Sequence, residues 1–181
     1  MARLDTKLES EGAEFLVLGN LLVNRIPTYK TYTNMSGYDL VTTNPEKNTS
    51  ARIQVKSRWE TGASSFPIKN YDCDFVVAAF LNRGSKNIKK KIKDPVFYVF
   101  PVSLLVDSPQ SETWNKFYLR YLSDPEIYRD NWKLISEFLN IKENQPVLST
   151  PRAAPSPRET STFGRNELQR HQQTPRPSLS N

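Results

Sequence analysis

Residues 36–58, SGYDLVTTNPEKNTSARIQVKSR, place an acid, an amide and an amine within two apolar runs. Asp39 lies in the first run, and Gln54 and Lys56 lie two residues apart in the second. A strand buries such groups at a free-energy cost unless they bind one another, face water or hold a metal. One interpretation is a solvated sheet face with a cross-strand ion pair, which contributes little stability. The other interpretation is a site for metal-assisted cleavage of phosphodiesters.

These residue types suit the chemistry of a hard divalent cation. Mg²⁺ prefers oxygen ligands, which carboxylate, amide and backbone carbonyl groups provide. The bound ion lowers the pKa of its water and neutralises negative charge on the phosphate. A nearby lysine can orient or deprotonate that water, or stabilise the developing negative charge. The second interpretation therefore predicts Asp39, Gln54 and the carbonyl of Val55 as metal ligands, with Lys56 acting on the water.

The two runs, 38–43 and 51–58, are separated by NPEKNTS, whose polar residues and Asn-Pro start predict a turn. We therefore expect an antiparallel hairpin. A turn centred midway between the runs would place Asp39 opposite Gln54. Side chains alternate along a strand, so Gln54 and Lys56 would share one face.

The flanking segments predict the elements that position this hairpin. Apolar residues at helical spacing predict a helix over 4–24, which Pro27 ends. The residues expected on the apolar face of this helix are Leu4, Leu8, Phe15, Leu18 and Leu22. A run of β-forming residues predicts a strand at 29–33, and apolar runs predict strands at 74–81 and 95–102. The order of helix, strands and helices predicts an α/β domain with a mixed sheet.

The C-terminal half of the chain predicts helices followed by a tail. Aromatic residues at helical spacing predict a helix at 113–122, and Asp124 followed by Pro125 is a helix start signal. Residues 144–181 are rich in proline, serine and threonine and poor in large apolar groups, which predicts a disordered tail. The expected division is one folded domain at 1–143 and this tail.

The bulk composition restricts the class of protein. The net charge is +6 and the pI about 9.4, which is compatible with a polyanionic partner. No apolar run is long enough to predict a membrane span, and the N-terminus has no features of a secretory signal. Cys73 is the single cysteine of the 181 residues, so no internal disulfide can form. Together these features predict a cytoplasmic protein.

Around the hairpin the sequence resembles the PD-(D/E)XK nuclease superfamily. GYDLV and RIQVKS are similar to its paired strands, with Asp39 at the first acidic position, Gln54 at the second and Lys56 at the lysine. AEFLVLGNLL is similar to the preceding helix, with Glu14 in the place of its acidic residue. The resemblance covers roughly residues 8–106 and is greatest to the Q-x-K branch, which includes intron-encoded homing endonucleases.

This resemblance implies a restriction-endonuclease-like fold, with a mixed central β-sheet and flanking helices. The catalytic residues that it implies are Lys56, Glu14, Asp39 and Gln54, with Mg²⁺ as cofactor (or Mn²⁺ in its place) and DNA as substrate. The sequence departs from the family pattern at two positions. Tyr38 stands where proline usually precedes the aspartate, and Gln54 replaces an acid, which removes one negative charge and weakens metal binding.

Several polar and basic residues near the hairpin are candidates for contacts with DNA. Ser57 and Arg58 follow Lys56 directly, and with Lys69 they are predicted to contact DNA. The basic run 86–93 would hold the DNA backbone without reading its sequence.

The sequence thus predicts a Mg²⁺-dependent endonuclease that hydrolyses DNA phosphodiester bonds. Duplex cleavage needs two active centres, so we expect a homo-oligomer, a dimer or tetramer assembled through the aromatic C-terminal helices. One alternative is a catalytically inactive DNA-binding or interaction module that keeps the nuclease fold. Another is an unrelated α/β scaffold whose tail recruits a partner.

Overall fold

The computed structural model of the chain describes residues 6–31, 37–85, 89–109 and 115–141. The predicted tail at 144–181 lies outside the described residues, so its disorder and the domain division stay predictions. In the described part of the chain, no helix combines the length and apolar character needed to cross a membrane. The elements, in chain order, are α1 (Thr6–Val23), β1 (Thr28–Lys30), β2 (Leu40–Asn44), β3 (Thr49–Arg58), β4 (Ser65–Pro67), β5 (Phe75–Phe80), β6 (Val96–Pro101), α2 (Val102–Val106), β7 (Lys116–Tyr118), two 3₁₀-helices (Leu119–Tyr121 and Pro125–Tyr128) and α3 (Lys133–Phe138).

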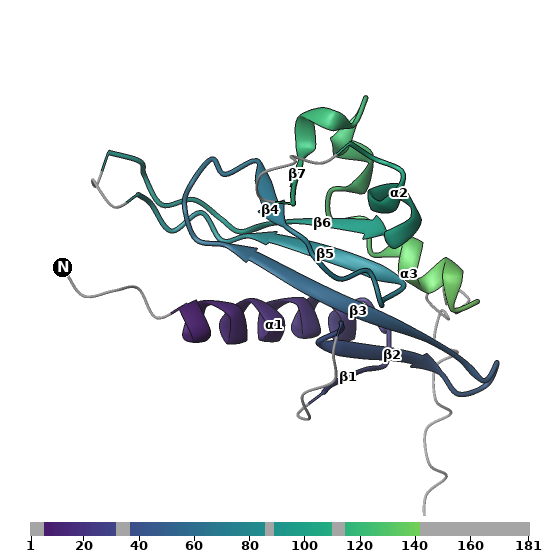
Figure 1. The fold of residues 1–181 in the computed structure, drawn as a ribbon. Coiled ribbons are helices and arrows are strands. Elements are labelled where there is room, and N and C mark those ends of the chain that lie inside the picture. Colours follow the sequence, from purple (N-terminus) through teal and green to yellow (C-terminus); the bar gives the residue numbers. More distant parts are fainter. Residues whose placement is uncertain (1–5, 32–36, 86–88, 110–114, 142–181) are drawn as a thin grey trace, which may run out of the picture. The chain divides into compact units, whose positions relative to one another are not determined.

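Five strands form a mixed sheet in the order β1-β2-β3-β5-β6. β3 and β5 are parallel, and every other neighbouring pair in this sheet is antiparallel. α1 lies against one face, whereas β4, β7 and α2 lie beyond the other (Figure 1). The expected α/β fold with a mixed central sheet and flanking helices is therefore confirmed.

The β2–β3 hairpin has the register that the sequence predicts. Leu40 pairs with Ile53 and Asn44 with Thr49, so the hairpin turns between them as expected. The buried amide of Asn44 donates to the carbonyl of Leu139 at 2.9 Å, and the Thr49 hydroxyl donates to the same carbonyl at 2.9 Å. These bonds fix the hairpin to the end of α3.

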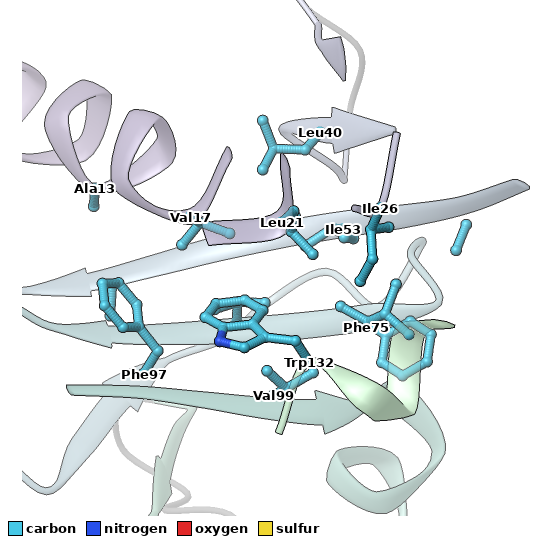
Figure 2. Close-up of a cluster of buried hydrophobic side chains, with 14 of the residues drawn as sticks. Ala13, Val17, Leu21, Ile26, Leu40, Ile53, Phe75, Phe97, Val99 and Trp132 are labelled. Atoms are coloured by element: carbon cyan, nitrogen blue, oxygen red, sulfur yellow. The ribbon is translucent and has the colours of Figure 1, made fainter. Parts of the chain in front are cut away.

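A first hydrophobic core joins α1 and α3 to one face of the sheet. Figure 2 shows Val17 and Leu21 of α1 directed toward the sheet, where Ile53 of β3 faces them. Trp132, at the start of α3, packs on Phe97 of β6 with ring centroids 5.8 Å apart. Burial of each such side chain contributes about 1.5–3 kcal/mol.

A second core covers the opposite face and is dominated by aromatic rings. Phe66 of β4, Phe100 of β6 and Phe117 of β7 are fully buried and pack on one another, with centroids 5.5–6.1 Å apart. Val76 and Ala78 of β5 join them on this face. Of the aromatic residues in the C-terminal segments, Phe117 and Trp132 are packed inside the domain, whereas Phe138 is 51% exposed.

The face by which α1 packs differs from the sequence prediction. The helix buries Ala13, Val17 and Leu21, spaced four residues apart, whereas Phe15 and Leu22 stay about half exposed. Of the other residues predicted to face the core, Leu18 is partly buried, Leu8 is exposed, and Leu4 lies outside the described part. Apolar residues surround this helix on several sides, so periodicity alone does not select the buried stripe.

The prediction for residues 113–122 was also wrong. This segment, expected to be helical, contains β7 and a 3₁₀-helix, and residues 59–73, for which the sequence predicts no element, contain β4. Phe66 pairs with Phe117 in an antiparallel two-stranded sheet. A partner so distant in the chain overrides the local helical pattern, because strand pairing depends on tertiary context.

The helix start at Asp124 is confirmed, but the helix is short. The Asp124 carboxylate accepts from the Glu126 N–H at 3.1 Å, and Pro125 opens a four-residue 3₁₀-helix. Asp130, with φ of 47°, then turns the chain before α3 begins. The predicted single helix is therefore divided by a left-handed residue.

We predict opposite effects for two adjacent leucines of α1. Leu21→Ala should lower the free energy of unfolding by about 2–5 kcal/mol, because Leu21 is fully buried. Leu22→Ala is the matched control and should change it by less than about 0.5 kcal/mol, since Leu22 is 50% exposed. Urea denaturation measures both values, and equal losses would contradict the observed orientation of α1.

Candidate active site

A hydrogen bond from the backbone of β3 holds the Asp39 carboxylate. The Asp39 N–H donates to the carbonyl of Ile53 at 2.8 Å, and its Oδ2 accepts from the N–H of Val55 at 2.7 Å. β2 begins only at Leu40, so the carboxylate accepts from an N–H of β3 that would otherwise bond a main-chain carbonyl of the neighbouring strand. Val55 lies between Gln54 and Lys56 in sequence, and the acid is therefore fixed at the centre of the Gln-x-Lys segment.

Gln54 and Lys56 point to the face of the sheet away from α1. In the parallel register they stand beside Val76 and Ala78, which belong to the second core. The paired register of the hairpin ends at Leu40 and Ile53, so Asp39 directly precedes the paired residues. Its carboxylate reaches the N–H of Val55, and its negative charge acts on Lys56. The structure therefore brings Asp39 to the segment that carries Gln54 and Lys56.

The environment of Lys56 makes its neutral form more accessible. Burial lowers the pKa of Lys56 from its ordinary value of 10.5, while the negative charges of the Asp39 carboxylate and, once it forms, the Cys73 thiolate oppose that shift. Desolvation disfavours the charged ammonium, whereas the adjacent carboxylate favours it. A lysine with a lowered pKa is better suited to accept a proton near neutral pH.

The Gln54 side chain has an unsatisfied oxygen. Gln54 is 7% exposed, and its Oε1 is buried with no hydrogen-bond partner among the described residues. A buried acceptor without a donor costs free energy, so such an atom suits a ligand that supplies positive charge. In the described ranges no three His, Cys, Asp or Glu side chains cluster closely enough to hold a metal ion. Any cation site at this edge would therefore combine the Asp39 carboxylate with this amide oxygen.

We expected Glu14 to face Asp39, Gln54 and Lys56, and this expectation was wrong. The Glu14 carboxylate binds the ammonium of Lys30, which also pairs with Glu11 at 3.1 Å. Lys30 stands opposite Leu40, a residue of the first core, so this ion pair lies on the α1 side of the sheet. The helix packs by the stripe that contains Ala13, and that orientation directs Glu14 toward β1.

The three predicted DNA contacts occupy different places. The Ser57 hydroxyl donates to Glu9 of α1 at 3.1 Å, on the face opposite Lys56. Arg58 shares the face of Lys56 by strand alternation. Lys69 is exposed on the segment between β4 and β5. Their roles toward DNA stay predictions.

Two residues of the site carried no chemical signal in the sequence. Gly37 has φ of 108°, and a Cβ there would lie 2.9 Å from the carbonyl oxygen of Asp72. This close approach seats the chain before Asp39 against the segment before β5. Cys73 lies beside Gln54 and Lys56, and burial raises the pKa of its thiol to about 11, so it adds no negative charge near neutral pH. Both placements depend on the pairing of β3 with β5, which the local sequence does not encode.

The chain is similar in structure to a bacterial homing endonuclease, I-Ssp6803I. The two superpose with a TM-score of 0.51 and 22% sequence identity, over 76% of this chain and 94% of that chain. No family model matches the sequence, and neither does any curated protein. The similarity is one of fold, and it agrees with the expected mixed sheet and flanking helices.

Gly37→Ala should disturb the candidate site more than a second glycine substitution on the same chain. The new Cβ would meet backbone at 2.9 Å and require a strained φ, so we expect a clear loss of stability and a shifted Asp39. At Gly12 of α1 a Cβ meets nothing within 4 Å, and Gly12→Ala should be neutral or stabilising by up to about 1 kcal/mol. Thermal unfolding and the amide shift of Val55 report both effects, and equal behaviour would refute the packing at Gly37.

The ionisation of Lys56 can be measured by NMR titration of its side chain. We expect a pKa below 10.5, and a lower one in Asp39→Asn, because that change removes the charge that favours the ammonium. Between the lowered pKa and 10.5 the unfolded chain binds more protons, so Lys56 makes stability rise with pH in that window. An unchanged Lys56 pKa in Asp39→Asn would show that the Asp39 charge does not act on Lys56.

Proposed function

We propose that the chain is a Mg²⁺-dependent endonuclease of the PD-(D/E)XK superfamily that hydrolyses DNA phosphodiester bonds. The observation that carries this proposal is the bond from the Val55 N–H to the Asp39 carboxylate, which sets that acid between Gln54 and Lys56. An acid, an amide oxygen and a lysine with a lowered pKa then share one face. The fold shared with a homing endonuclease supports the same reaction class.

Asp39 and Gln54 are the residues that would hold the metal. The Asp39 carboxylate has Oδ1 left after the bond to Val55, and Gln54 offers its unsatisfied Oε1. The carbonyl of Val55 is proposed as a third oxygen ligand. When bound, Mg²⁺ would supply charge neutralisation at the phosphate and a more acidic water; Mn²⁺ takes the same type of oxygen ligands.

Lys56 would act on the water that attacks the phosphate. In its neutral form the Nζ would accept a proton from that water as the water oxygen forms a bond to phosphorus. The ester bond then breaks, and the leaving oxygen departs with the electron pair of that bond and takes a proton from solvent. Burial favours this neutral form, and the Asp39 carboxylate then stabilises the ammonium that results. With one carboxylate in the trio, the site carries less negative charge than a two-acid site, so metal binding should be weak without substrate.

DNA is the proposed partner, and a homo-oligomer is the proposed assembly. The net charge of +6 favours a polyanion. Two strands of a duplex require two active centres, which a dimer or tetramer of this chain would provide.

The low charge of the site favours one alternative function. Because Gln54 contributes no negative charge, the same fold could bind DNA without cleaving it. Metal-dependent nicking of supercoiled DNA separates the two functions, since a binding module leaves the plasmid intact.

The central test is nicking of supercoiled plasmid with Mg²⁺ or Mn²⁺. Lys56→Ala should abolish nicking and change DNA affinity by no more than a few-fold, because one lysine is a small part of the phosphate contacts. Lys47→Ala, at the exposed turn of the hairpin, should leave both unchanged. Such a pattern is typical of a group that acts mainly in the transition state.

Two companion variants test the metal ligands. Gln54→Glu adds a carboxylate and should tighten Mg²⁺ binding in calorimetry, whereas Asp39→Ala should lose both metal binding and nicking. Equal nicking by the wild type and Lys56→Ala would place the active site elsewhere. Absence of nicking by the wild type, with DNA binding retained, would favour the inactive module.

A further inference from the structure

The face of β3 that carries the candidate site has a different charge environment at each end. Every second residue of β3 lies on this face: Arg52, Gln54, Lys56 and Arg58. One arginine therefore precedes the Gln-x-Lys segment and another follows it. By strand rise, each arginine lies about 7 Å from its neighbour in the segment. The two arginines are matched in type and spacing, and they differ in their partners.

Two carboxylates neutralise the arginine before the segment. Arg52 Nη1 binds Asp72 Oδ1 at 2.5 Å, and Arg52 Nε lies 3.5 Å from Asp74 Oδ2. Asp74 also accepts from the Arg52 backbone N–H at 2.7 Å. This end of the row therefore carries one cation and two anions, which disfavours a phosphate.

The arginine after the segment has unused donor capacity. The Nε of Arg58 is buried with no hydrogen-bond partner among the described residues, and no described carboxylate lies within ion-pair distance of its guanidinium. A buried donor without an acceptor costs free energy, and arginine suits the paired oxygens of a phosphate.

Beyond Arg58 the chain presents a basic arm, residues 82–95, between β5 and β6. Figure 1 shows that the described parts of this arm extend past the end of β3. The hydroxyl of buried Thr61 donates to the Lys91 carbonyl and accepts from the Gly84 N–H, both at 2.9 Å. The buried amide of Asn82 donates to the Asp94 carbonyl at 2.9 Å. The base of the arm is therefore held in place on both sides.

The described part of the arm is strongly cationic. Its exposed basic residues are Arg83, Lys89, Lys90, Lys91 and Lys93. Lys90 pairs with Glu60 at 3.0 Å, and Asp94 is the one acid among the described arm residues. The described part of the arm therefore has a net positive charge, and it lies past the end of β3 at which Arg58 has no acidic partner among the described residues.

We propose that the phosphate backbone of a bound nucleic acid runs from the candidate active site over Arg58 to the basic arm, and not over Arg52. This inference rests on the proposed function, and it adds the direction of the substrate along β3. Arg58 binds a phosphate next to the one at Lys56, and the arm binds phosphates further along. Asp72 and Asp74 close the opposite path by repulsion.

Matched arginine variants test the path without requiring cleavage. DNA binding is measured by fluorescence anisotropy of a short duplex, with EDTA present, over a range of salt concentrations. Arg58→Ala should weaken binding and reduce the slope of log affinity against log salt by about 1, as does Lys91→Ala. Arg52→Ala should leave the slope unchanged. Arg58→Lys keeps the positive charge and should retain most of the slope; it replaces Arg58→Ala as the test variant if Arg58→Ala unfolds.

A cross-linking experiment tests the direction itself. A photo-cross-linking amino acid at position 89 in the arm should capture DNA, whereas the same group at position 47 in the hairpin turn should not. Equal slopes for Arg58→Ala and Arg52→Ala, or capture at position 47 alone, would overturn the inference. If these results hold while the wild type never nicks DNA, the path stands and the proposed enzymatic function fails.

Discussion

The bond between the Val55 N–H and the Asp39 carboxylate is the constraint on which the candidate site depends. Where β2 has not yet begun, a side chain occupies the place of a main-chain acceptor. The bond satisfies the Val55 N–H, for which the neighbouring strand provides no carbonyl acceptor. Holding the acid at this position therefore stabilises the backbone. The same atom of Val55 also fixes the acid relative to the two side chains that flank it. Structure and proposed chemistry therefore share one hydrogen bond.

The sheet separates two groups of polar residues that the sequence places close together. On the α1 face, Glu14 and Lys30 neutralise each other and Ser57 binds Glu9. On the other face, Gln54 keeps an unsatisfied oxygen. On that same face Arg52 pairs with Asp72 and Asp74, so the buried polar side-chain atoms without a hydrogen-bond partner among the described residues are confined to Gln54 and Arg58.

The sequence predicts what depends on neighbouring residues and misses what depends on distant ones. The hairpin register follows from two runs and a turn, and it brings Asp39, which directly precedes the paired Leu40, to the segment of β3 that carries Gln54 and Lys56. The buried side of α1 does not follow, because apolar residues lie on several sides of it and the sheet selects among them. The predicted position of Glu14 was wrong for that reason. The strands β4 and β7 were missed because each acquires its structure from the other.

The environment of the candidate site depends on whether the two-stranded sheet of β4 and β7 stays closed. β4 and β7 pair over three residues each, and they bring Phe66 and Phe117 onto the face that carries Lys56. Short elements joined across a long stretch of chain open more readily than the central strands. Each such opening would admit water to this face and restore the hydration that the Lys56 ammonium has lost. The basicity of the lysine is thus coupled to a local unfolding equilibrium some distance along the chain.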